Sequence, residues 1–296
     1  MKKTGFISIV GRPNVGKSTL LNAILGEKVA IVSSKPQTTR NRITGIHTDG
    51  ENQYVFLDTT GIHAPKNALG EYMVKTANST MLDADVIVFV ADAAREPGQL
   101  DTTIIENIKA SHIPAILVLN KTDTANAETI GKQLTEYAKL LDFEAYVPIS
   151  ARRGEGVKAV LDECSKFLHE EEWFFPDDIV TDQPERQMAA EIIREKLLRT
   201  LNKEIPHGIA VLIEEFKDEG TLIRISANIY CEKESHKGII VGKRGAELKM
   251  VGTYAREDLE KLFGTKVYLN LWVKVKANWR ENEQIVSNFG YNREDE

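Results

Sequence analysis

The segment from residue 11 to residue 18 constrains the fold of this chain more than any other stretch. Its residues are Gly11, Arg12, Pro13, Asn14, Val15, Gly16, Lys17 and Ser18. An apolar run precedes it and a helical pattern follows it, which predicts a strand, a glycine loop and a helix. Glycines let successive backbone N–H groups point at phosphate oxygens, and the helix dipole adds positive potential there. Lys17 would reach the β- and γ-phosphates and the Ser18 hydroxyl would ligate Mg²⁺, so the segment predicts a nucleoside-triphosphate site.

The chain has 296 residues, which favours two domains. Its longest apolar run, residues 86–91, is far too short to span a bilayer, and we expect no signal peptide before the first predicted strand. Cys164 and Cys231 suggest neither a disulfide framework nor a metal cluster, which favours a reduced, cytoplasmic compartment. The formal net charge is −6, made of −5 over residues 1–180 and −1 over 181–296. Any nucleic-acid surface must therefore be local.

Residues 1–170 alternate apolar runs with amphipathic stretches, which predicts an α/β domain with a mostly parallel sheet covered by helices on both faces. The predicted buried strands are 6–10, 54–57, 86–91, 115–119 and 146–149. Such sheets bind ligands at the carboxyl ends of their strands. Gly11, Asp58, Asn120 and Ser150 each follow directly after one of these runs.

Two further motifs fit a nucleotide site. The first is Asp58, Thr59, Thr60 and Gly61, where the carboxylate can hold Mg²⁺ through its water shell and the glycine N–H can approach the γ-phosphate. The second is Asn120, Lys121, Thr122 and Asp123, followed later by Ser150, Ala151 and Arg152.

Guanine presents two adjacent N–H donors on one edge, and the Asp123 carboxylate can accept both, whereas adenine would be repelled. Asn120 would brace neighbouring loops, the Lys121 stem would lie along the base, and residues 150–152 would offer a backbone N–H to the guanine oxygen. A helix N-cap explains Asn120–Asp123 alone. It does not explain the ordered series of motifs.

Residues 171–183 break the periodicity with an acidic run, aromatics and proline, which predicts a linker anchored by its aromatic residues. The second domain is predicted over residues 184–280. Its elements are a helix over 184–201, strands over 209–216 and 222–230, helices over 235–241 and 246–263, and a last strand over 267–275. The alternation in residues 222–230 favours an antiparallel sheet with one wet face. The tail, 281–296, is polar and is expected to pack loosely.

A glycine loop lies between the last two predicted helices. The residues expected to bind single-stranded RNA there are Lys237, Gly238, Ile239, Ile240, Gly242, Lys243, Arg244 and Gly245. The absence of glycine side chains lets sugar and phosphate approach the backbone, while Ile239, Ile240 and Val241 would form an apolar wall for the bases. Residues 233–249 carry a charge of +3, and residues 266–280 hold four basic residues and no acid. The second domain therefore resembles a type II KH domain, a module that binds single-stranded nucleic acid.

The motif series of the first domain resembles the translation-factor-related GTPases. That resemblance implies that a threonine of a switch loop ligates Mg²⁺ when γ-phosphate is present; Thr39 is favoured and Thr38 is the alternative. Ile62 stands where Ras-like enzymes place a water-orienting Gln, which implies slow intrinsic hydrolysis. Asn14 matches a residue that ligates K⁺ in part of the group. Arg12 is expected to face solvent and Arg40 to belong to the switch, so neither is favoured as an arginine finger.

Both domains together resemble the Era family of bacterial GTPases over essentially the whole chain. The resemblance implies a GTP-hydrolysing switch, with Lys17, Thr39, Gly61 and Asn14 in catalytic roles and Ser18, Thr39 and Asp58 at the metal. It also implies assembly of the small ribosomal subunit through the 3′ region of its ribosomal RNA, with occasional peripheral association with the inner membrane face. The alternative is a signalling GTPase whose C-terminal domain docks a protein and has no need of Gly242 or Gly245.

Overall fold

The chain divides into two compact units in the computed structural model, which describes residues 1–35, 37–61, 65, 67–201 and 205–291. The first unit holds Met1–Val32, Thr39–Pro65 and Met73–Asp182. The second holds Ser33–Thr38, Lys66–Tyr72 and Gln183–Glu296. The two short segments before residue 73 thus belong to the second unit, although the sequence prediction placed them in the first domain.

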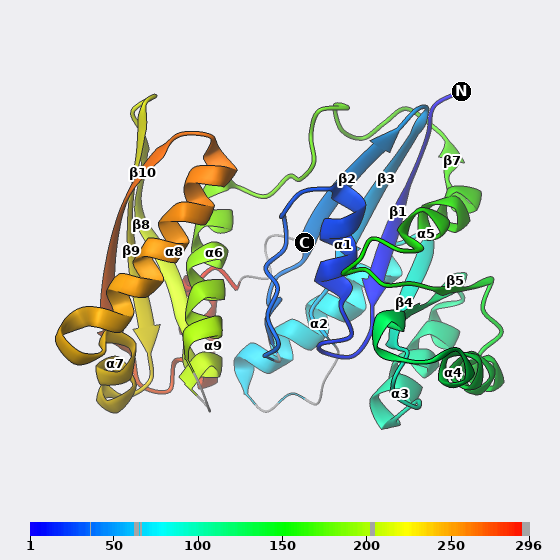
Figure 1. Ribbon diagram of the computed structural model, residues 1–296, viewed down its shortest axis with the longest axis horizontal. Coiled ribbons are helices and arrows are strands. Elements are labelled where there is room, and N and C mark those ends of the chain that lie inside the picture. The colour runs from blue at the N-terminus through cyan, green and yellow to red at the C-terminus, as the bar shows by residue number, and fades with distance from the viewer. Residues whose placement is uncertain (36, 62–64, 66, 202–204, 292–296) are drawn as a thin grey trace. The chain divides into compact units, whose positions relative to one another are not determined.

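The first unit is built around one sheet with the strand order β2-β3-β1-β4-β5-β6 (Figure 1). Its strands are β1 Lys3–Val10, β2 Ile43–Asp49, β3 Asn52–Asp58, β4 Val86–Asp92, β5 Ala115–Asn120, β6 Ala145–Pro148 and β7 His169–Glu170. Neighbouring strands are parallel except that β2 pairs antiparallel with β3, and β7 pairs antiparallel with the start of β1. The five predicted strands are present, whereas β2 and β7 were not predicted.

Helices cover both faces of this sheet because the strands are apolar on both sides. They are α1 Lys17–Leu25, α2 Ala68–Leu82, α3 Gln99–Ser111, α4 Ala127–Leu140 and α5 Val157–Cys164. Residues that alternate along each strand enter different cores. Ile7 and Val88 pack with α1 and α5, whereas Val10 and Phe89 pack with α2, α3 and α4. Residues 11–18, called the P-loop below, and the other motif residues lie at or just after the ends of β1, β3, β5 and β6.

The predicted linker is bound to the first unit through its aromatic residues and backbone. Phe174 stacks on Phe6 with the ring centroids 4.9 Å apart, and Trp173 donates to the carbonyl of Glu51. Gln53 exchanges two hydrogen bonds with the backbone of Phe175. The aromatic anchors expected from the sequence are therefore confirmed.

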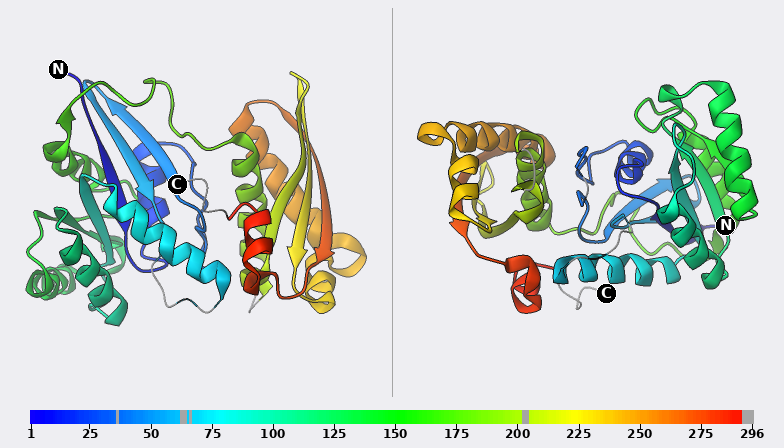
Figure 2. Two further views of the ribbon diagram at one scale, coloured as in Figure 1. Left: turned by 180° about the vertical axis from the view of Figure 1, so that it is seen from behind. Right: turned by 90° about the horizontal axis from the view of Figure 1, so that it is seen from below.

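The second unit packs helices on a three-stranded sheet of order β10-β9-β8 (Figures 1 and 2). Its elements are α6 Glu185–Thr200, β8 Ala210–Asp218, β9 Leu222–Cys231, α7 Glu234–Val241, α8 Ala246–Phe263, β10 Lys266–Val275 and α9 Glu283–Asn288. Alternate residues of β9, among them Ile223, Ile225 and Ile229, enter one core with α6 and α8. β8 is antiparallel to β9, but β10 is parallel to it, so the expectation of an antiparallel sheet was only half right.

The described part of the tail packs more tightly than predicted. It packs on Trp279, which precedes the tail; Trp279 is fully buried, and its indole N–H donates to the carbonyl of Gly208 at 3.0 Å. Phe289, just after α9, lies with its ring centroid 4.6 Å from Tyr230 of β9 and 5.2 Å from Trp279. The polar composition of the tail hid these aromatic anchors.

Candidate nucleotide site and nucleic-acid groove

The glycines of the P-loop sit where no side chain fits. A Cβ on Gly11 would lie 2.3 Å from the carbonyl oxygen of Val90, and one on Gly16 would lie 2.3 Å from Asn120 Nδ2. Gly16 also has a φ of 103°, in the region that favours glycine. A Cβ on Gly61 would lie 2.7 Å from Pro13 N, so the loop after β3 closes directly onto the P-loop.

Lys17 begins α1 and is buried inside the loop that it follows. Its Nζ donates to the carbonyl oxygens of Gly11 and Arg12, both at 3.0 Å. Burial lowers the pKa of Lys17 to about 8, although the nearby Asp58 carboxylate raises it. The Lys17 ammonium therefore lies among the carbonyl oxygens of the loop. A bound phosphate would stabilise its charged form, which burial disfavours.

Three oxygen side chains from separate motifs converge on Ser18. Its Oγ donates to Asp58 Oδ2 at 2.6 Å and lies 2.9 Å from Thr39 Oγ1. Burial raises the pKa of Asp58 to about 6, while Lys17 and the Ser18 hydroxyl lower it. Two hydroxyls and a carboxylate are the donor types that Mg²⁺ takes in nucleotide sites, so this set fits the ion. Thr38 Oγ1 instead donates to the carbonyl of Lys35, which separates Thr39 from its alternative.

The predicted base site is assembled around Asn120 at the end of β5. Its Nδ2 donates to the carbonyl of Val15 at 2.9 Å, and its Oδ1 accepts the backbone N–H groups of Lys121 and Ala151. Lys121 Nζ reaches the carbonyl of Asn14 at 2.7 Å and Asp92 at 2.8 Å. The side chain of Asn120 thus braces three segments, as the sequence suggested.

Asp123 is oriented by Ser150. The Ser150 hydroxyl donates to Asp123 Oδ1 at 2.8 Å and lowers the pKa of that carboxyl. Asp123 therefore remains ionised and keeps oxygen lone pairs for a ligand. The backbone of Thr122 donates to the carbonyl of Ile149, which ties this loop to the last strand. The Ala151 N–H is already used by Asn120, so it does not stand open for the guanine oxygen in this structure.

Several other predicted residues have structural roles. The Thr59 hydroxyl donates to the carbonyl of Ile9, and the Thr60 hydroxyl donates to that of Met73, so both side chains are committed to packing. Arg12 does not face solvent as expected: its Nε lies 3.0 Å from the fully buried Asp101 carboxylate of α3. Arg40, which was expected to belong to the switch, is 1% exposed. Ile62 lies outside the described residues.

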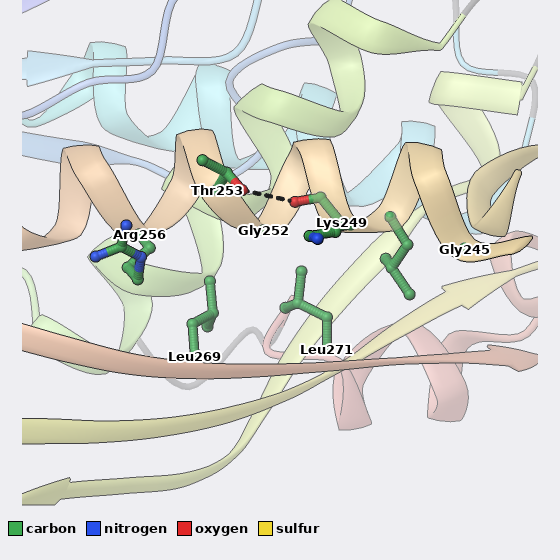
Figure 3. Close-up of a pocket in the computed structure, with 8 residues that line it drawn as sticks. Gly245, Lys249, Gly252, Thr253, Arg256, Leu269 and Leu271 are labelled. Carbon is green, nitrogen blue, oxygen red and sulfur yellow. Dashed lines mark hydrogen bonds between the residues drawn. The ribbon is translucent and has the colours of Figure 1, made fainter.

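The second unit carries a groove of about 400 Å³ between α8 and β10 (Figure 3). It is lined by Gly245, Leu248, Lys249, Gly252, Thr253, Arg256, Leu269 and Leu271. The lysine and arginine stand at its sides, while Leu269 and Leu271 point from β10 toward the helix (Figure 3). Gly252 adds no side chain at the middle, where a Cβ would already touch Leu271 at 3.5 Å. The groove is therefore apolar along its floor and basic along its rim.

The glycine loop lies at one end of this groove. Lys243 and Arg244 are exposed, and Arg244 adopts a φ of 55° between the two glycines. Ile239 is 52% exposed on α7, but Ile240 is fully buried in the core. The predicted apolar wall therefore does not include Ile240, because α7 turns this side chain into the core; Ile239 remains available to a base. Lys237 and Gly238 lie on α7 itself.

The sequence prediction missed most of the groove. Of its eight RNA-contact residues, only Gly245 lines it. A usable signal was present in α8: Lys249, Gly252 and Arg256 recur at helical spacing, with a glycine inside a helix where it costs stability. No comparable signal in the sequence shows that Leu269 and Leu271 line the groove. Their position depends on which edge of the sheet β10 joins.

Comparisons with known proteins agree with these two units. Residues 6–121 match the family model described as 50S ribosome-binding GTPase, and residues 204–280 match the KH domain model. The chain thus belongs to the class of P-loop GTPases that carry a KH domain.

Curated relatives narrow this class. The chain is 49% identical to GTPase Era of Ruminiclostridium cellulolyticum over 98% of its own length and 97% of the relative, and 50% identical to GTPase Era of Clostridioides difficile over 99% of each. It belongs to the Era family of GTPases.

Solved structures give the same result. A variant of Aquifex aeolicus Era bound to GDP and aluminium fluoride is similar at a TM-score of 0.94 and 42% identity, covering 98% of this chain and 99% of that one. An Era structure in complex with MgGDPNP and nucleotides 1506–1542 of 16S ribosomal RNA is similar at a TM-score of 0.95, with the same identity and coverage.

Proposed function

We propose that this GTPase is a switch that binds the 3′ region of small-subunit ribosomal RNA through its KH domain and assists maturation of that subunit. In the first unit, the backbone of residues 11–18 holds the phosphates and Lys17 contacts the β- and γ-phosphates. The Gly61 N–H approaches the γ-phosphate. Asp123 accepts the two N–H donors of guanine, with Ser150 fixing its orientation and the stem of Lys121 along the base.

Ser18, Thr39 and Asp58 would hold magnesium, which would offset charge on the phosphate oxygens. Thr39 comes from the switch segment, so its ligation of magnesium would depend on the presence of the γ-phosphate. With Ile62 in place of a water-orienting glutamine, we propose slow intrinsic hydrolysis. Exposed Asn14 would ligate potassium, which would supply the positive charge given elsewhere by an arginine finger. The Arg12–Asp101 pair supports this, because it holds that arginine against α3.

The potassium proposal predicts a salt-specific rate. GTP turnover is expected to be faster in potassium than in sodium chloride at equal ionic strength, and Asn14→Ala is expected to lose that difference. The measurement is phosphate release in both salts for both proteins. Equal rates of the wild type in the two salts would remove the ion from the mechanism.

One observation carries the RNA assignment: a basic glycine loop opens onto an apolar groove with Lys249 and Arg256 on its rim. Absent side chains let a sugar–phosphate backbone come close, and the groove offers apolar surface to bases. The GTPase family model names the 50S subunit, but it ends at residue 121, before the KH domain. The near full-length structural relative bound to 16S ribosomal RNA therefore supports the small subunit over the large one.

The test requires a variant that spares the fold. A Cβ on Gly242 would lie 2.8 Å from Glu247 Cβ and 2.9 Å from Glu247 N, so Gly242→Asp would disturb the start of α8. Arg244→Asp is preferable, because aspartate tolerates the left-handed backbone at this position and reverses an exposed charge. We expect at least a tenfold loss of affinity for a 16S 3′-end fragment and unchanged GTP affinity. Lys158→Asp, an exposed reversal in the first unit, is the matched control.

If Arg244→Asp and the wild type bind this RNA equally, the KH assignment fails and the alternative, a signalling GTPase whose C-terminal unit docks a protein, takes its place. We propose a cytoplasmic location, supported by two buried free cysteines, Cys164 and Cys231. Among the described helices, none combines the length and apolarity needed to cross a bilayer. Peripheral association with the inner membrane face is retained from the family resemblance alone, and flotation with anionic vesicles tests it.

A further inference from the structure

β10 presents different chemistry on its two sides. Leu269 and Leu271 point toward α8 and line the groove (Figure 3). Since successive side chains of a strand point to opposite faces, Tyr268, Asn270 and Trp272 lie on the other side, away from the helices. Tyr268 is 49% exposed and Trp272 is 61% exposed. Trp272 is the most exposed aromatic side chain among the described residues.

The surroundings of these rings are polar and basic along β10. The pairing register places Tyr268 beside Arg224, and Arg224 Cζ lies 5.4 Å from the Tyr268 ring centroid. Arg224 also pairs with Glu219 at 3.1 Å, so its charge is partly offset. Lys266, Lys274 and Lys276 lie on β10 or directly after it, whereas Arg280 is paired with Glu232. β8, at the far edge of the sheet, carries exposed Glu214 and Glu215. An anionic ligand would therefore follow β10 rather than cross the sheet.

We propose that the outer face of β10, with Trp272 and Tyr268, is a stacking platform that extends the RNA site beyond the groove. This inference rests on the proposed RNA-binding function. β10 is the edge strand of its sheet, so a strand of RNA that leaves the groove passes over a single strand to reach this face. Rings stack on bases of any sequence, and neighbouring lysines follow the phosphates.

The spacing of the rings defines what the platform binds. Tyr268 and Trp272 are four residues apart on one strand, or about 13 Å. They therefore receive bases that are not stacked on each other, and Asn270 between them can hydrogen-bond a base edge. At the other end of the face, Phe289 packs on Tyr230, the register partner of Lys274. The platform is thus bounded by the tail and takes only a few nucleotides, all of them single-stranded.

Length dependence of RNA binding separates the platform from the groove. A KH groove holds about four nucleotides. The test compares a four-nucleotide RNA with one of about ten nucleotides that contains the same core, using the full chain with a non-hydrolysable GTP analogue. The double variant Tyr268→Ala/Trp272→Ala is expected to bind the short RNA like the wild type and to lose about fivefold to a hundredfold per ring on the long RNA. Tyr254→Ala on α8, also 49% exposed, is the matched control and should affect neither RNA.

A second pair of variants shows whether stacking is the cause. Trp272→Phe should keep most of the affinity for the long RNA, whereas Trp272→Leu should lose it, because leucine is apolar but has no π face. Neither should change the salt dependence, since no charge is removed. Equal affinity of the double variant and wild type for the long RNA would overturn the platform and leave this face to a protein partner. Equal loss on both RNAs would place the effect in the groove and overturn it as well. Failure of the wild type to bind either RNA would instead refute the proposed function.

Discussion

At the scale of single residues, the nucleotide site contains charged side chains that are buried, although such groups are more stable in water. Lys17 and Asp58 are both buried. Burial favours the neutral form of each, so it lowers the pKa of Lys17 and raises that of Asp58, although the opposite charge of the neighbour acts against both shifts. Both residues could be singled out from the sequence, because the motif fixes which residue types occur; their roles toward phosphate and magnesium stay predictions. The Arg12–Asp101 pair could not be identified in this way, since the partner lies 89 positions away on another element.

The raised pKa of Asp58 predicts how the nucleotide-free protein responds to pH. The folded state binds this proton more tightly than the unfolded state, so stability falls as pH rises from about 4 through 6. Asp58→Asn removes that dependence. Between pH 4 and 7 the wild type should therefore lose about 1–3 kcal/mol of unfolding free energy relative to the variant. The measurement is the free energy of unfolding of both proteins at several pH values in this range. If it changes with pH equally in both, the raised pKa of Asp58 is contradicted.

Base choice should depend on Asp123. Asp123→Asn replaces an acceptor pair with one acceptor and one donor, so GTP affinity should fall by about tenfold to a hundredfold. Xanthosine triphosphate, which carries a carbonyl in place of the guanine amino group, should gain affinity. Competition binding with the two nucleotides measures both effects. Unchanged GTP affinity would remove Asp123 from the base site.

At the scale of elements, the sequence predicted well where local signals suffice. The predicted bounds of α8 match the structure, because Gly245 and Gly264 flank it with left-handed backbones and an apolar stripe runs between them. It failed where pairing decides. Alternation in β9 and β10 shows which residues are buried, but it does not show that the two strands are parallel. The groove between α8 and β10 follows from that pairing and was missed for this reason.

The glycine loop gives a prediction that belongs to the element as a whole. With about three to five phosphates neutralised, log affinity for RNA against log salt should have a slope of roughly −2 to −3.5. Lys243→Ala and Arg244→Ala should each flatten the slope by about 0.7 and should weaken all RNA sequences alike, since phosphate contacts carry no sequence information. Titrations at several salt concentrations measure the slope. A loss confined to one RNA sequence would show that these side chains read bases instead.

At the scale of the whole molecule, the two units are expected to be coupled through the nucleotide. Thr39 and Ser18 should hold the switch segment through magnesium when GTP is bound, and we expect that state to present the KH surface more freely. RNA affinity should then be higher with a non-hydrolysable GTP analogue than with GDP. Linkage requires RNA to raise affinity for the analogue, relative to GDP, by the same factor. Equal RNA affinity in both nucleotide states would leave the RNA site intact but remove the coupling.

The packing of the chain's last aromatic residues also sets an order of events during synthesis. All the described strands of the first unit precede Thr181, whose hydroxyl donates to the carbonyl of Thr44 in β2. The first unit can therefore form once Thr181 has emerged from the ribosome. The second unit still lacks β10 and the buried Trp279, which lies 98 positions later. Synthesis proceeds at about 5–20 residues per second. The first unit could therefore be folded for roughly 5–20 s before the second unit has the residues that complete its core. During that interval the nascent chain can bind GTP before it can hold RNA.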